Sequence, residues 1–322
     1  FNANTSFSNQ KFLVAIGFLW DDWTSTSGPL YSGMVHFDHY AIVFSILCIA
    51  VTLCIFVVSK GYFDQEGQVA EYYSLLIFSL TGAVLVNSYH NFSMLFLGIE
   101  IMSVALYILV GIRKRDKASN EAALKYFIMG AFSTGFLLFG IALLYGATGS
   151  FDLSEVKEYV VNNPQSISPL FYGGILFLIV GLTFKVGAVP FHFWTPDVYE
   201  GAPILITSYM STVVKVASFA GLLRLFSYSL LPLQDFWTPV FLVIAILTLF
   251  VGNISALMQS SFKRMLAYSS VSHAGYMLFA IIAVGATSAN SIFAYGLAYS
   301  LATIVAFTGL ILVKKTTGSE HF

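Results

Sequence analysis

The chain has 322 residues, of which 57% are hydrophobic and 10% are charged, and its net charge at neutral pH is −1. Soluble domains carry about 25% charged residues, so this composition excludes a soluble globule and predicts a protein that crosses a membrane several times. The nearly balanced charge also argues against nucleic acid as a partner.

Nine apolar runs are each long enough to cross a bilayer as a helix, which needs about 20 residues. In chain order, these runs are 37–58, 72–90, 92–112, 120–146, 170–189, 202–231, 237–257, 262–284 and 290–313. Residues 12–20 resemble the end of an earlier helix. The polar stretch 147–169 has apolar residues at helical spacing and predicts a short helix at the membrane interface.

Basic residues gather in the links that alternating spans place on one side of the membrane. This side holds the link 113–117, Lys60, Lys125, Lys263, Arg264, Lys314 and Lys315. The other side holds the acidic residues Asp21, Asp22, Asp38, Asp152, Glu155, Glu158 and Asp235. Because basic links stay on the cytoplasmic side, this separation predicts the orientation and supports the number of spans.

The run that contains Lys185 continues into Gly187 and Pro190, within the stretch KVGAVPFHFWTPDVYEGAP. Proline lacks an N–H group and interrupts a helix. Irregular backbone at membrane depth is tolerated only where protein buries it or where it lines a water-filled cavity. We therefore predict a discontinuous helix broken at Gly187 and Pro190. His192, beside the break, is expected either to gate a path or to cap a helix end.

Glu100 lies near the middle of the run 92–112, and a carboxylate at that depth must be protonated or paired. Lys185 is its expected partner, because a lysine inside an apolar run needs a compensating group as well. Such a pair could take part in proton transfer. It could also be a static salt bridge that fixes helix packing.

Lys215 has no acidic residue in its own run, and its neighbours are mostly small or carry hydroxyl groups. Such neighbours allow close helix approach and leave room for water. Lys215 is therefore either a proton carrier, since burial disfavours its charged form, or a lysine held by backbone carbonyls. His273, in the middle of a later run, suits a proton relay, although an interhelical hydrogen bond would also explain it. Arg224, near the end of its run, is expected to reach the interface.

The sequence predicts no metal site and no cofactor site. No group of His, Cys or acidic residues has the spacing of metal ligands, and there is no glycine-rich phosphate loop. Cys48 and Cys54 do not form a C-x-x-C pair and are interpreted as small apolar residues.

These segments resemble the antiporter-like membrane subunits of respiratory complex I, the NADH:quinone oxidoreductase, and most closely its N subunit. The resemblance rests on the stretch 185–203 and on STVVKVASF, residues 211–219. It is supported by FLGIEIMSVALYILV, LKYFIMGAFSTGFLLFG and NISALMQSSFKRMLAYSSVSHAGY. The acidic PDVYEGAP turn favours the N subunit over the related L and M subunits and over the multisubunit cation/proton antiporters.

The resemblance implies an antiporter-like bundle with discontinuous helices and inverted repeats, part of a fourteen-helix fold. Residues 1–322 are then expected to form one transmembrane domain that is incomplete at both ends, from the second helix to the eleventh. The first inverted repeat is expected in 70–231, and part of the second in 237–322.

The resemblance also implies roles for four residues. Glu100 matches the family's fifth-helix glutamate, Lys185 the lysine of its broken seventh helix, and Lys215 its eighth-helix lysine. His273 falls in the region of the tenth helix, where a protonatable residue would continue the path of the proton.

The implied function is proton translocation in the membrane arm of the complex, driven by quinone reduction in other subunits. This chain would carry no redox chemistry, because NADH, FMN, iron–sulfur clusters and quinone would bind elsewhere. The expected partners are a neighbouring antiporter-like subunit, small membrane subunits and lipid. The expected location is a bacterial inner membrane or an organellar inner membrane. Two alternatives stay open: a subunit of a multisubunit sodium/proton antiporter, and a scaffold whose charges only fix helix packing.

Overall fold

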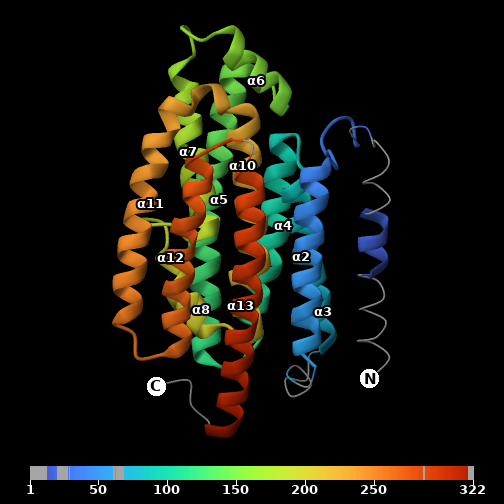
Figure 1. Ribbon diagram of the computed structural model, residues 1–322, viewed down its shortest axis with the longest axis vertical. Coiled ribbons are helices and arrows are strands. Elements are labelled where there is room, and N and C mark those ends of the chain that lie inside the picture. The colour runs from blue at the N-terminus through green and yellow to red at the C-terminus, as the bar shows by residue number, and fades with distance from the viewer. Residues whose placement is uncertain are drawn as a thin grey trace.

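The computed structural model of the protein describes residues 13–19, 28, 30–60, 62, 69–285 and 287–317. Long helices run up and down side by side and form one bundle (Figure 1). The elements are α2 (His39–Val58), α3 (Val69–Ser88), α4 (Phe92–Val110), α5 (Lys117–Thr148), α6 (Leu153–Asn162), α7 (Pro169–Val186), α8 (Trp194–Gly201), α9 (Ile204–Tyr209), η2 (Met210–Val214), α10 (Lys215–Arg224), η3 (Leu225–Ser229), η4 (Leu231–Leu233), α11 (Gln234–Leu257), α12 (Phe262–Ile282) and α13 (Ser288–Thr317).

Nine helical segments in the described part of the chain are long and apolar enough to cross a membrane. They correspond one to one to the nine predicted runs. One of them, Ile204–Ser229, is a continuous crossing that changes from α-helix to π-helix and back, as α9, η2, α10 and η3. The prediction of an all-α protein with several membrane crossings is confirmed.

The segment Ile204–Ser229 forms the centre of the bundle. Every residue in its most apolar stretch of 18 residues is buried. In the most apolar stretch of Lys117–Thr148, only 33% of the residues are buried. Its middle part, α10, packs against α2, α3, α7, α12 and α13. A polar side chain on this central helix therefore faces other helices rather than lipid.

Polar side chains fix where many of the helices begin. Each accepts a hydrogen bond from a backbone N–H of the first turn, which would otherwise have no partner. These capping residues are Asp38, Asn91, Asp116, Asp152, Ser168 and Ser261. They stand in the polar links between apolar runs, so the predicted and observed helix starts lie close together.

The two ends of the bundle carry different polar groups. At one end, Arg113 Nη2 donates to Tyr62 Oη at 3.0 Å, and the N–H of Ile204 donates to the same oxygen at 3.1 Å. At the other end lies α6, the short helix that the sequence predicted within 147–169, with Glu155 and Glu158 on it (Figure 1). The side of the membrane that each end faces stays a prediction.

Candidate functional site

The predicted break after Lys185, at the end of the run 170–189, is present in the structure. Helix α7 ends at Val186 and α8 begins at Trp194. Gly187 adopts a left-handed conformation with φ 73°, and its N–H donates to Phe184 O at 3.0 Å. The N–H of Ala188 reaches back to Thr183 O, also at 3.0 Å, which completes a Schellman termination. A glycine adopts this conformation at little steric cost.

The irregular segment after Gly187 is partly buried: Ala188, Val189 and His192 are buried, whereas Pro190 and Phe193 are exposed. The N–H of Val189 donates to Thr248 Oγ1 of α11 at 2.9 Å, and the peptide bond from Val189 to Pro190 is cis. Trp194 Nε1 donates to Phe184 O at 3.0 Å, which ties the start of α8 to the end of α7. His192 is buried in this segment, and its ring centroid lies 5.0 Å from that of Phe193. The protein therefore buries the first residues of the break and leaves Pro190 and Phe193 exposed, and a gating role for His192 stays a prediction.

Lys185 and Glu100 lie in the same region, but each is held by a hydroxyl group. The buried Nζ of Lys185 donates to Ser103 Oγ at 2.9 Å, and Thr134 Oγ1 donates to Glu100 Oε1 at 2.8 Å. Among the described residues, no Lys185–Glu100 ion pair within 4.0 Å is formed. The structure differs from the predicted direct contact because Ser103, one helical turn after Glu100, offers the ammonium a nearer acceptor.

Lys215 lies on the fully buried central helix, directly after the π-helical segment η2. Its Nζ donates to both the carbonyl oxygen and the Oγ of Ser270 on α12. It also lies 5.8 Å from the ring centroid of Tyr299 on α13, at cation–π distance. Within the part of the chain described, no carboxylate pairs with this ammonium. The structure thus shows a buried lysine with acceptors but without a counter-ion.

His273 of α12 lies close to two tyrosines of α13. Its Nδ1 is 2.6 Å from Tyr295 Oη, and its ring centroid is 4.7 Å from that of Tyr299. A cavity of about 380 Å³ lies beside these side chains and is also lined by Ser269 and Thr303. Tyr299 therefore lies between Lys215 and His273. The interhelical hydrogen bond that the sequence left open is present, and it does not exclude a relay.

Five polar residues of this region were not singled out for a role from the sequence: Ser103, Thr134, Ser270, Tyr295 and Tyr299. Two of them had a usable signal, because Ser103 is three residues from Glu100 and Ser270 three residues from His273. Such spacing places both side chains of a pair on one face of a helix. The others contact partners on a different helix, and helical spacing carries no signal for contacts between helices.

Arg224 is buried near the end of the central helix and is paired there with an acidic residue. Its Nη2 lies 2.5 Å from Asp38 Oδ1, and its guanidinium lies 5.0 Å from the ring centroid of Tyr40. Its charge is therefore matched at the end of the bundle, away from Lys215.

The described residues contain no group of three or more His, Cys, Asp or Glu side chains arranged to hold a metal ion. Cys48 is buried, Cys54 is exposed, and neither forms a disulfide.

Comparison with known proteins agrees with the geometry. A family model described as "NADH:quinone oxidoreductase/Mrp antiporter, TM" matches residues 90–321. The NADH-quinone oxidoreductase subunit N of Flavobacterium psychrophilum is 41% identical over 295 residues, which are 91% of this chain and 64% of that relative. The chain thus spans slightly less than two thirds of that relative's length.

Two solved structures have a similar fold. A chain of respiratory complex I from Thermus thermophilus, solved with bound aureothin, superposes with a TM-score of 0.76 and 34% identity, covering 95% of this chain and 64% of that one. A chain of the Mrp complex from Dietzia sp. superposes with a TM-score of 0.75 and 18% identity, covering 96% and 59%. The second similarity shows the fold alone.

The family match covers the break at Gly187, all four interior titratable residues and the central helix, and the fold agrees with it. The chain belongs to the membrane-subunit family of NADH:quinone oxidoreductases and Mrp antiporters.

Proposed function

We propose that this chain translocates protons as part of the membrane arm of an NADH:quinone oxidoreductase. The observation that carries the proposal is Lys215, an ammonium group on the fully buried central helix that pairs with none of the described carboxylates. An uncompensated charge at this depth is costly and is rarely retained without a function. The 41% identity to an NADH-quinone oxidoreductase subunit N supports this assignment.

The first step of the proposed mechanism is a change of partner by Lys185. With its ammonium on Ser103, as observed, the charge of Lys185 is not neutralised, and its field disfavours the charged, protonated form of Lys215. When the ammonium of Lys185 moves to Glu100, the two opposite charges cancel at the position of Lys215. Lys215 can then hold its proton. Closing of the Glu100–Lys185 pair thus loads Lys215 with a proton, and opening of the pair unloads it.

The second step carries the proton from Lys215 towards His273. The hydroxyl of Ser270 accepts from the ammonium and the ring of Tyr299 lies beside it, while the ring of His273 lies 4.7 Å from the ring of Tyr299 in a tilted arrangement. The adjoining cavity of about 380 Å³ has room for several water molecules beside its polar groups. Hydroxyl groups and water together provide a hydrogen-bonded route for the proton.

Further parts of the proposal follow from the family. The energy would come from quinone reduction in other subunits, so that NADH, FMN, iron–sulfur clusters and quinone bind outside this chain. A neighbouring antiporter-like subunit, small membrane subunits and lipid would contact it in a bacterial inner membrane. Residues 70–231 would form one inverted repeat and 237–322 part of the other.

The proposal is tested by two substitutions of Lys215 in the assembled complex in membrane vesicles. Lys215→Met removes the proton carrier, and we expect proton pumping to be lost and quinone reduction to slow. Lys215→Arg keeps a positive charge but cannot release a proton near neutral pH, so it should assemble and still fail to pump. Lys157→Met, on α6 outside the spans, is the matched control and should pump normally.

Wild-type pumping in Lys215→Arg would show that Lys215 is only a structural cation, as in a scaffold. The family also includes Mrp antiporters, and a chain of a solved Mrp complex shares this fold, so the second candidate function is sodium/proton antiport. Sodium-dependent transport that is insensitive to quinone-site inhibitors would favour that second function.

A further inference from the structure

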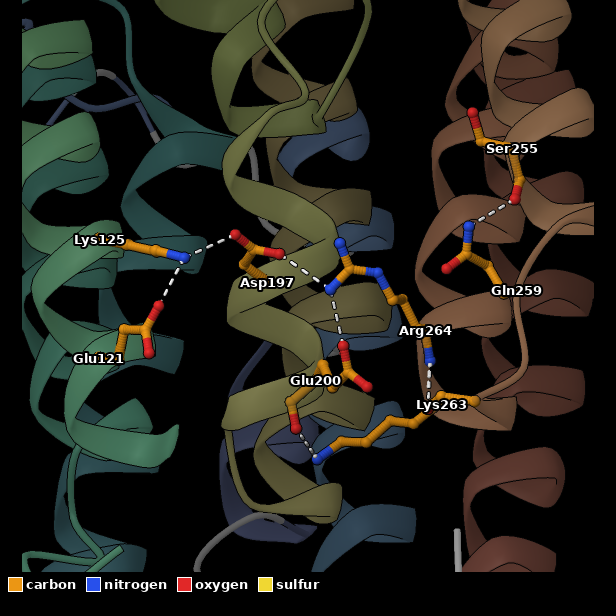
Figure 2. Close-up of polar contacts among 9 residues, drawn as sticks. Glu121, Lys125, Asp197, Glu200, Ser255, Gln259, Lys263 and Arg264 are labelled. Carbon is orange, nitrogen blue, oxygen red and sulfur yellow. Dashed lines mark hydrogen bonds and ion pairs between the residues drawn. The ribbon is translucent and has the colours of Figure 1, made fainter. Parts of the chain in front are cut away.

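Helix α8 is a short element whose position depends on its neighbours. It has eight residues, follows the break directly, and ends at Gly201, with Ala202 as its C-cap before α9. Its first residue has no side-chain cap. Because a helix of this length is not stable alone, contacts with other helices must hold it. Asp197 and Glu200 lie three residues apart on it and face the basic residues drawn in Figure 2.

Contacts on one side tie α8 to α5. Lys125 Nζ lies 2.8 Å from Asp197 Oδ2 and also 2.8 Å from Glu121 Oε1 in its own helix. A Cβ atom added at Gly201 would lie 2.6 Å from Ala118 O, so the backbones of the two helices touch here. Glycine at this position permits that approach.

Contacts on the other side tie α8 to the start of α12 (Figure 2). Arg264 Nη1 lies 2.9 Å from Asp197 Oδ1 and 2.7 Å from Glu200 Oε2. The buried Lys263 donates through its Nζ to Glu200 O at 2.8 Å and to Ala202 O. Positive charge at the C-terminal end of a helix complements its dipole, so these contacts favour one position of α8.

The helices that hold α8 also carry the interior polar contacts. Further along α5, Thr134 donates to Glu100, while further along α12, Ser270 accepts from Lys215. Helix α8 itself follows the break after Lys185. A shift of α8 therefore acts on both interior lysines through rigid helices.

We propose that Lys263 and Arg264 are positioning residues that couple the broken helix to the Lys215–Ser270 contact. When α8 moves, they move the start of α12 with it, and Ser270 changes its distance from Lys215. This inference rests on the proposed proton translocation. It adds a connection between the broken helix after Lys185 and the contact of Lys215 with Ser270.

The test uses two carboxylates that bind the same lysine at the same distance. Asp197→Asn removes the partner on α8, whereas Glu121→Gln, the matched control, removes the partner within α5. In the assembled complex, we would measure amide hydrogen exchange of residues 194–201 and 262–272, together with protons pumped per NADH oxidised. Asp197→Asn should speed exchange in both segments by roughly twofold to fivefold, as expected for partly exposed ion pairs. It should also lower the ratio of protons to NADH, and the control should do neither.

Arg264→Lys and Arg264→Gln separate coupling from simple destabilisation. The lysine variant keeps a cation beside Asp197 and Glu200 and should retain most of the pumping ratio, whereas the glutamine variant should lose it. If Asp197→Asn does not assemble, Asp197→Glu is the second variant and should retain coupling. Equal behaviour of Asp197→Asn and Glu121→Gln, or faster exchange in α8 without a change in α12, would overturn the inference.

The exchange measurement does not depend on pumping. A failure of the Lys215 test therefore overturns the proposed function alone, and a failure of the exchange test overturns the coupling alone.

Discussion

Lys185 and Ser103 are joined by a hydrogen bond of 2.9 Å between α7 and α4, and Ser103 stands one helical turn after Glu100. The ammonium of Lys185 thus has a neutral acceptor next to a carboxylate on the same helix. We expect exchange between the two acceptors to occur by rotation of the lysine side chain, since both acceptors lie on α4 three residues apart. Side-chain rotation is far faster than helix movement, so this exchange need not limit turnover.

Ser103→Ala removes the neutral acceptor and leaves Glu100 as the nearest acidic partner of Lys185. We expect the pair to remain closed and proton pumping to slow by about tenfold, since a hydrogen bond to a charged group contributes about 1.5 kcal/mol or more. Ser133→Ala is the control, because Ser133 is also buried but donates to the backbone carbonyl of Gly181. Pumping in vesicles measures the effect, and equal rates in the two variants would contradict the role of Ser103.

Ser270→Ala removes one of the two acceptors of Lys215 and leaves the other, the backbone carbonyl, in place. We expect a partial loss, roughly threefold to tenfold in pumping rate, because one hydrogen bond of a charged donor is lost and one remains. Ser272→Ala, two residues further along the same helix and also buried, should stay close to wild type. A larger loss of pumping in Ser272→Ala than in Ser270→Ala would rule out a proton path through Ser270.

Tyr295 and Tyr299 are predicted to act differently. Tyr295→Phe removes the hydroxyl group 2.6 Å from His273 Nδ1, so it should slow pumping if His273 relays protons. Tyr299→Phe keeps the ring near Lys215, whereas Tyr299→Leu also removes the cation–π contact. Comparing the three variants separates loss of a hydroxyl from loss of a ring. Pumping at the wild-type rate in Tyr295→Phe would show that the hydrogen bond of His273 has only a structural role.

Gly187→Ala tests the backbone of the break. Alanine in a left-handed conformation costs roughly 1–2 kcal/mol. Its Cβ would also meet Thr195 Oγ1 at 2.9 Å. We expect a lower unfolding temperature of the assembled complex. Gly135→Ala is the control: a Cβ there meets no atom within 4 Å, and alanine favours the helix by roughly 0.5–1 kcal/mol. An unchanged unfolding temperature in Gly187→Ala would show that the backbone at the break can rearrange to accommodate the alanine side chain.

The membrane crossings and the break could be predicted from the sequence because each has a local cause. Hydrophobic length gives the crossings, and Gly187 with Pro190 interrupts one of them. Costly charges in apolar runs identify Glu100, Lys185 and Lys215 without any knowledge of the fold.

The partners of those charges could not be predicted in the same way. Whether Lys185 reaches Glu100 or Ser103 depends on the relative rotation of α4 and α7, which no local pattern records. The contact of Lys215 with Ser270 crosses from the central helix to α12 and depends on packing in the same way. The π-helical segments were missed as well, since Met210–Val214 has the composition of an ordinary apolar helix.

The two π-helical segments, η2 before Lys215 and η3 after Arg224, give the central helix a further property. A π-turn closes its hydrogen bond over one more residue than an α-turn does. If η2 became α-helical, every residue after it would rotate by about 100° about the axis, because that is the angle between successive residues of an α-helix. The ammonium of Lys215 would then leave Ser270, because the rotation carries its side chain to another side of the helix. The contact between the central helix and α12 can therefore be made or broken by a change in the winding of η2.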